Sequence, residues 1–137
     1  MEKTMTLPER AADLLRGRNW ASLVDLRPDG SPHVTPVWVD YDGEHVLVNS
    51  AYGRCKVRNI QRDPRVAIDV LPADNQQAGY VSVSGTAELV DEGADEHIDK
   101  LAKKYLGVDE YPYRSPGEKR VIIRIRPERV DVHGVAE

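Results

Sequence analysis

Hydrophobic residues follow two spacing patterns along the chain, and the patterns predict mostly strands. Six segments are rich in apolar and β-branched residues, and two of them, 33–41 and 120–134, alternate apolar and polar positions with the period of two that strands have. We predict strands over 20–26, 33–41, 44–50, 65–71, 80–90 and 120–134. Three other segments carry apolar residues three or four positions apart, which predicts amphipathic helices over 6–19, 54–64 and 93–107.

Short local signals mark turns and irregularities in these elements. Asp42 and Gly43 form a dipeptide that favours a tight hairpin. Thr6, three residues before a glutamate, has the spacing of a capping box at the start of the first helix. Pro36 cannot donate to a ladder and predicts an edge strand or a bulge, and Gly85 predicts a bulge or a bend.

The order of the elements predicts one mainly β domain. About six strands follow one another in consecutive antiparallel hairpins, and an antiparallel β-barrel with helices at its periphery would remove the sheet edges by closure. The length of 137 residues is typical of one domain. Repeats, low-complexity tracts and linkers are absent from the sequence, so we expect a single domain over 1–137.

Composition and charge narrow the environments that suit the chain. It is 40% hydrophobic and 31% charged, and its net charge of -4 argues against general nucleic-acid binding, which needs a broad basic surface. Apolar stretches fall short of the ~20 residues of a membrane helix, and the first ten residues lack the apolar core of a signal peptide. Cys55 is the only cysteine, which favours a reducing compartment. We expect a cytoplasmic protein without nucleic-acid or membrane partners.

One segment departs from the acidic balance of the chain. From Arg54 to Arg65 there are five cations and one acid, directly after a glycine at the predicted strand-to-helix turn. The first N–H groups of a helix lack intrahelical partners and carry partial positive charge, so basic side chains there suit a phosphate. Gly53 would let the backbone approach a ligand, Ser50 adds a hydroxyl, and Asn59 lies one helical turn further along. The residues alone leave a second interpretation open, a solvated helix face whose cations pair with acids elsewhere.

Four segments together give the chain a resemblance to a known family. They are 19–43, 46–70, 80–90 and 120–130, and the second contains the pattern small-x-G-R-x-K-x-x-N. The chain resembles the FMN-binding split-barrel proteins related to pyridoxamine 5'-phosphate oxidase, which use flavins or deazaflavins, and among them the small proteins that use coenzyme F420. The resemblance implies a six- or seven-stranded antiparallel split β-barrel that forms a homodimer.

The resemblance also implies a coenzyme groove between the two protomers of that dimer. Arg54 and Lys56 would hold the coenzyme phosphate, and Asn59 would help them. In the turn, Gly53 would contact the coenzyme. The wall beneath the tricyclic ring would be formed by Thr35, Pro36 and Val37. The edge of the ring or its linker would be approached by Ser50 and Ala51. The implied function is an F420-dependent oxidoreductase that transfers a hydride between the deazaflavin and a small organic substrate.

Alternatives to this function stay open. FMN could replace F420, because relatives that bind FMN also place basic residues near this turn. A non-catalytic protein that stores or delivers F420 is the other alternative. The chain is short compared with pyridoxamine phosphate oxidases and has no segment that matches their substrate-binding C-terminal region, which counts against that activity.

The remaining candidate residues carry weaker signals. The four histidines are scattered without the spacing of metal ligands, and His97, among acids, is expected on a solvated helix face. Cys55 is expected to be a half-buried helix residue. No catalytic residue is assigned, and the aromatic residues that line either the groove, the dimer interface or the core are Trp38, Tyr41, Tyr80, Tyr111 and Tyr113.

Overall fold

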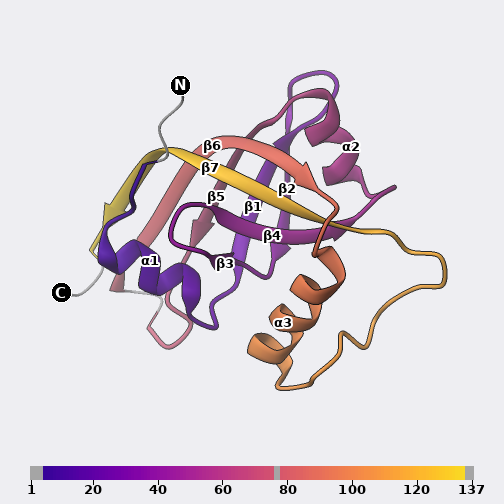
Figure 1. Ribbon diagram of the computed structural model, residues 1–137. Helices are drawn as coiled ribbons and strands as arrows, with labels where there is room; N and C mark the ends of the chain where they lie inside the picture. The colour runs from indigo at the N-terminus through magenta and orange to yellow at the C-terminus, as the bar shows by residue number, and fades with distance from the viewer. Residues whose placement is uncertain (1–4, 76–77, 135–137) are drawn as a thin grey trace.

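A curled sheet of seven antiparallel strands organises the part of the chain that the computed structural model describes, residues 5–75 and 78–134 (Figure 1). The strand order is β2-β1-β5-β6-β7-β4-β3, and β6 and β7 form the longest pair. The strands are β1 Ala21–Leu26, β2 Pro32–Val37, β3 Asp40–Tyr41, β4 Val46–Ala51, β5 Arg65–Val70, β6 Tyr80–Val90 and β7 Arg120–His133. The predicted mainly β, antiparallel fold is confirmed.

The two ends of the sheet explain why the barrel is split. β2 and β3 lie at opposite ends of the strand order, yet only Trp38 and Val39 separate them along the chain. The predicted strand 33–41 is therefore broken in two, and the chain passes from one sheet edge to the other. In the described residues no ladder joins these two edge strands, so the prediction that closure removes the sheet edges is wrong.

Three helices of the described chain lie outside the sheet (Figure 1). They are α1 Glu9–Arg16, α2 Cys55–Arg62 and α3 Ala94–Leu106, inside the three predicted segments. Pro8 is the N-cap of α1 and no side chain caps it, so the predicted capping box at Thr6 does not form. Within the described ranges, every helix is too short or too polar to cross a bilayer.

Two predicted irregularities have clear geometric causes. The β6–β7 register shifts between Ser84 and Gly85, which confirms the predicted bulge. A Cβ on Gly85 would lie 2.0 Å from the carbonyl oxygen of Arg126, so only glycine fits there. Pro36 lies in β2, which among the described strands pairs with β1 alone, and this confirms the predicted edge strand.

The core formed by the described residues consists of two apolar clusters. The larger one fills the inside of the curled sheet, and its large side chains that are at most 2% exposed include Leu15, Leu23, Ile68, Ile123 and Ile125. The smaller one is formed by α3 side chains that pack against two aromatic rings outside the helix, and it comprises Ile98, Leu101, Tyr105, Trp38 and Tyr111. Because Trp38 lies at the split, the second cluster forms one side of the opening there.

Candidate functional site

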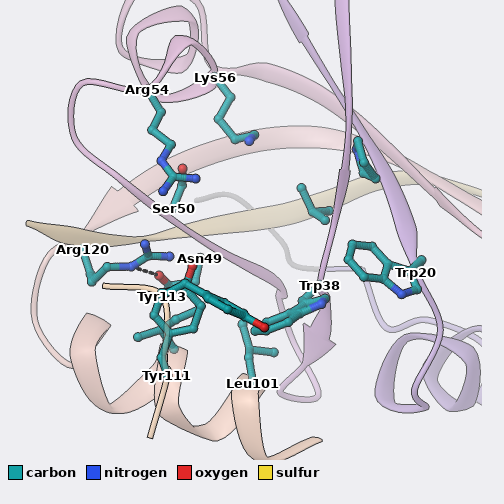
Figure 2. Close-up of a pocket in the computed structure, with 13 residues that line it drawn as sticks. Trp20, Trp38, Asn49, Ser50, Arg54, Lys56, Leu101, Tyr111, Tyr113 and Arg120 are labelled. Atoms are coloured by element: carbon teal, nitrogen blue, oxygen red, sulfur yellow. Dashed lines mark hydrogen bonds between the residues drawn. The ribbon is translucent and has the colours of Figure 1, made fainter. Parts of the chain in front are cut away.

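A groove of about 320 Å³ opens at the split of the barrel (Figure 2). The edge strand β2, the link after it and β4 contribute to it, together with the start of α2, one face of α3, the loop 107–119 and the start of β7. Its lining residues are Trp20, Pro36, Val37, Trp38, Asn49, Ser50, Arg54, Lys56, Ile98, Leu101, Tyr111, Tyr113 and Arg120. Figure 2 shows a cationic end at Arg54 and Lys56 and an aromatic end at Tyr111 and Tyr113.

The cationic end is formed by the turn between β4 and α2. Gly53 has a φ of +97°, a left-handed conformation that favours glycine. A Cβ on Gly53 would meet no atom within 4 Å, so backbone conformation rather than crowding within the chain requires glycine here. Arg54 is the N-cap of α2, and the helix is held inward by Val57 and Ile60, which are 0% and 3% exposed. The predicted inward face of this helix is confirmed.

Lys56 is a half-buried cation in the first turn of α2. Within the described part of the chain, no carboxylate lies within ion-pair distance of its Nζ. Burial, followed by the positive charge of Arg54, lowers the pKa of the Lys56 ammonium below its usual 10.5. A partly desolvated ammonium beside a guanidinium is unfavourable on its own and becomes favourable when an anion binds both. This favours the anion site over the solvated helix face.

Glu118 connects the cationic end with the start of β7. Its side chain is 8% exposed, and its Oε1 accepts a hydrogen bond from Arg54 Nη2 at 3.3 Å. Its Oε2 lies 3.2 Å from Arg120 Nη1. Arg54, Lys56 and Arg120 all line the groove, and among the described residues Glu118 is the one carboxylate that pairs with any of them, so the site is positive in a chain whose net charge is -4.

A chain of hydrogen bonds orients Arg120 in the groove. Asn49 Oδ1 accepts a hydrogen bond from Arg120 Nε at 2.9 Å, and Asn49 Nδ2 donates to the Ala94 carbonyl at 2.9 Å. Asn49 Nδ2 also lies 3.0 Å from His97 Nδ1. Burial lowers the pKa of His97 to about 4, so the ring is neutral near pH 7 and Nδ1 can accept this hydrogen bond. The prediction that His97 lies on a solvated face is wrong, because α3 turns this side chain toward β4.

The other end of the groove is a wall of aromatic rings. Trp38 and Tyr105 stack with their centroids 5.2 Å apart, and Tyr111 meets Trp38 edge to face at 6.0 Å. The Tyr105 hydroxyl donates to the Asn19 carbonyl at 2.6 Å, and burial raises the pKa of Tyr105 to about 12. Tyr105 is therefore a neutral, fixed support for Trp38. Flat aromatic surfaces of this kind bind planar ligands.

Five of the nine predicted coenzyme-contacting residues line the groove, namely Pro36, Val37, Ser50, Arg54 and Lys56. Ser50 is 2% exposed and its Oγ lacks a hydrogen-bond partner among the described residues, so it is available to a ligand. The other four predicted residues, Thr35, Ala51, Gly53 and Asn59, are not part of the lining.

Asn59 has a structural contact in place of a position in the groove. It is 3% exposed, and its Nδ2 donates to Oδ1 of the fully buried Asp25 at 2.7 Å. The same Asp25 oxygen lies 2.9 Å from His33 Nδ1. Asn59 therefore fastens α2 to β1, and its predicted help in phosphate binding has no geometric support in this chain.

Sequence reasoning missed Asn49 and Arg120 and placed Cys55 wrongly. Arg120 carried no local signal beyond its position at the first residue of a strand, and its contact with Asn49 spans 71 positions. Tyr41 is a core residue at 5% exposure, and Tyr80 stacks on His133 outside the groove lining. Cys55 is exposed rather than half-buried. In the described ranges, no three His, Cys, Asp or Glu side chains are placed to hold a metal ion.

Comparisons with known proteins agree with this fold. The family model for pyridoxamine 5'-phosphate oxidase matches residues 7–134. A solved structure named as an F420 reductase is 33% identical, with a TM-score of 0.78 over 91% of this chain and 98% of its own. A conserved hypothetical protein from Mycobacterium tuberculosis is 26% identical, with a TM-score of 0.72 over 94% of this chain and 85% of its own. The General Stress Protein 26 of Bacillus anthracis shares the fold at 19% identity, with a TM-score of 0.67 over 90% of this chain and 91% of its own.

Proposed function

The chain belongs to the pyridoxamine 5'-phosphate oxidase family of flavin-binding split barrels, and we propose that it is an oxidoreductase that uses coenzyme F420. In this proposal it transfers a hydride between the deazaflavin and a small organic substrate. The F420 assignment is supported by the motif around Arg54 and Lys56 and by the 33% identical relative named as an F420 reductase.

The observation that carries the proposal is the unpartnered cation at the start of α2. Lys56 is half-buried beside Arg54, its pKa is lowered, and it lacks an acidic partner among the described residues. The buried Ser50 Oγ in the same groove also lacks a partner in that part of the chain. A phosphate group would satisfy the ammonium, one guanidinium fork and a hydroxyl together, so the residues fit the phosphate of the coenzyme.

The residues of the chain would bind and orient the coenzyme, whose ring supplies the hydride chemistry. Arg54 and Lys56 would fix its phosphate, and Pro36 and Val37 at the sheet edge would form an apolar wall for its ring. Trp38 and Tyr111 would shield the substrate end of the groove from water. With these roles the protein needs no compact acid–base triad, and a proton donor on the substrate side is left unassigned.

A homodimer is the second part of the proposal. The outer face of the sheet places apolar side chains side by side, because Val24 is the cross-strand neighbour of both Val34 and Ala67. Val34 is 58% exposed, an unfavourable position for an apolar side chain unless a partner covers it. A second copy that packs on this face would bury it.

Light scattering tests the dimer and its interface. The wild-type protein should have the mass of a dimer, and Val34→Glu should have the mass of a monomer. A wild-type monomer would contradict the dimer, and an unchanged dimer mass in the variant would contradict this interface.

Parallel titrations of the purified protein with F420 and with FMN test the coenzyme assignment. We expect F420 fluorescence to be quenched at micromolar coenzyme and FMN to bind more weakly. Tighter binding of FMN would support the FMN alternative. Tight binding of F420 without turnover of a panel of enones and quinones would support a storage or delivery protein, and binding of neither coenzyme would contradict the proposal.

A further inference from the structure

We propose that Arg120 is the centre of a second anion subsite, which binds the carboxylate of a planar aromatic substrate on the Tyr111 side of the groove. This inference rests on the proposed function and extends it by naming the substrate class. It uses residues outside the coenzyme motif, on β4, β7 and the loop 107–119.

The first observation is that a buried guanidinium leaves most of its donors unused. The Arg120 side chain is 3% exposed and lines the groove. Among the described residues it makes one hydrogen bond, from Nε to Asn49, and its Nη1 forms an ion pair with Glu118 Oε2 at 3.2 Å that lacks hydrogen-bond geometry. Arginine carries five N–H donors, and burying them without acceptors is costly. A carboxylate matches this fork in shape and charge and would accept from it in a bidentate manner.

The second observation is that the guanidinium is held in a fixed orientation. Asn49 is anchored on α3 through the Ala94 carbonyl and His97, and its Oδ1 receives the Arg120 Nε hydrogen. Cζ of Arg120 lies 5.0 Å from the centroid of the Tyr111 ring, within cation–π distance. A preorganised donor loses little entropy when it binds a ligand, so this arrangement is suited to recognition and not only to stability.

The third observation is the shape and chemistry of the surrounding wall. Tyr111 stands edge-on to both Trp38 and Tyr113, with ring centroids 6.0 Å and 5.7 Å away. Leu101 of α3 completes the wall beside these rings (Figure 2). The aromatic rings of this wall suit a planar aromatic ligand, and the Arg120 guanidinium beside them suits a carboxylate. Together they favour a planar aromatic acid.

The charge of the groove leaves room for two anions. Three cations and one carboxylate, Glu118, give a formal surplus of two positive charges. Arg54 at the N-cap of α2 and Arg120 beside Tyr111 contact the two oxygens of Glu118, so their guanidiniums flank one carboxylate (Figure 2). A phosphate held by Arg54 and Lys56 would leave the unused donors of Arg120 available to a second ligand.

Calorimetric titration with 2-naphthoate and its neutral amide, 2-naphthamide, tests the subsite at constant ionic strength. In saturating inorganic phosphate we expect wild-type protein to prefer the carboxylate by about ten-fold or more, as a charged bidentate contact provides. Arg120→Met should reduce this preference to less than about two-fold, and Arg120→Lys should keep only part of it. The matched control is Arg124→Met, on the same strand but paired with Glu88 and outside the groove lining, which should behave as wild type.

Each contrary result has a defined meaning. An equal affinity for acid and amide in the wild type would overturn the subsite, and so would competition between naphthoate and inorganic phosphate, because both would then share one anion site. If naphthoate competed with the coenzyme but not with inorganic phosphate, Arg120 would belong to the coenzyme site, and the proposed class of aromatic acid substrates would be overturned. Because Arg120→Met leaves Glu118 without one partner, the double variant Arg120→Met/Glu118→Gln should also lose the preference while melting cooperatively. Failure of coenzyme binding in the separate F420 and FMN titrations would contradict the proposed function instead.

Discussion

The two ends of the cation-rich segment 54–65 look alike in sequence and differ in the folded protein. At its second end, Arg65 donates two hydrogen bonds to Asp63, from Nε at 3.0 Å and from Nη2 at 2.8 Å. Arg62 donates to the Leu26 carbonyl and to Asn59 Oδ1. At its first end, Arg54 shares Glu118 with another arginine, and Lys56 has no acidic partner in the described ranges.

The difference shows how a ligand site is distinguished from a solvated helix face. Charge spacing alone is nearly the same at both ends, so it cannot separate them. Burial and pairing do so, because the Arg65 side chain is 74% exposed and satisfied, whereas Lys56 is half-buried and unsatisfied. The cations of the second end, Arg62 on α2 and Arg65 at the start of β5, are thus solvated or paired, and the first end has the properties of an anion site.

The largest expected effect is on coenzyme affinity. Lys56→Ala should weaken binding of the phosphate-bearing coenzyme by about 10- to 100-fold, because it removes a charge-assisted contact in a partly desolvated site. Arg65→Ala is the matched control, and it should change the affinity by less than about two-fold because Arg65 is exposed and already paired with Asp63. Fluorescence titration of both variants measures this, and equal losses in the two would remove the distinction between the ends.

Asn59 gives the second largest effect, on stability. Asn59→Ala should lower the free energy of unfolding by about 1–3 kcal/mol, because the buried Asp25 loses a hydrogen-bond donor. Urea denaturation measures this change, with Gln61→Ala, an exposed residue on the same helix, as the control. Loss of coenzyme affinity at unchanged stability would instead make Asn59 a direct ligand.

The pH dependence of binding is the smallest of the three effects. The pKa of the Lys56 ammonium is lowered below 10.5, and an anion binds the charged form, so affinity should fall as the pH rises through this lowered pKa. Lys56→Arg should bind with an affinity that stays level over the same alkaline range, since arginine keeps its charge. Calorimetry from pH 7 to pH 10 tests this, and the same decline in both proteins would exclude Lys56 as its source.

Local signals were enough to predict most of the fold. The Asp42-Gly43 turn joins β3 and β4, and Gly85 forms a bulge, because each depends on the backbone preferences of one or two residues. The break of strand 33–41 was missed because Trp38 and Val39 leave one sheet edge for the other, which depends on how the sheet curls. Seven strands therefore replace the six expected from the pattern in the described chain.

The candidate site was predictable only at its cationic end. Arg54 and Lys56 follow a glycine in a short motif, so spacing alone suggested them. Asn49 meets Arg120 and Arg54 meets Glu118 through contacts that span 71 and 64 positions, and no sequence spacing reports these contacts. Asn59 shows the reverse case, in which a motif position is used for a structural hydrogen bond to Asp25.

The most direct test of the account compares each coenzyme with its phosphate-free form. F420 and the same deazaflavin without its phosphate, and FMN and riboflavin, are titrated into wild-type protein, Lys56→Ala and Arg65→Ala. We expect the phosphate of the coenzyme that binds to add about ten-fold or more in affinity in the wild type and in Arg65→Ala. In Lys56→Ala the phosphate should add less than about three-fold. A phosphate contribution of the same size in all three proteins would contradict the assignment of this groove as a phosphate-binding site.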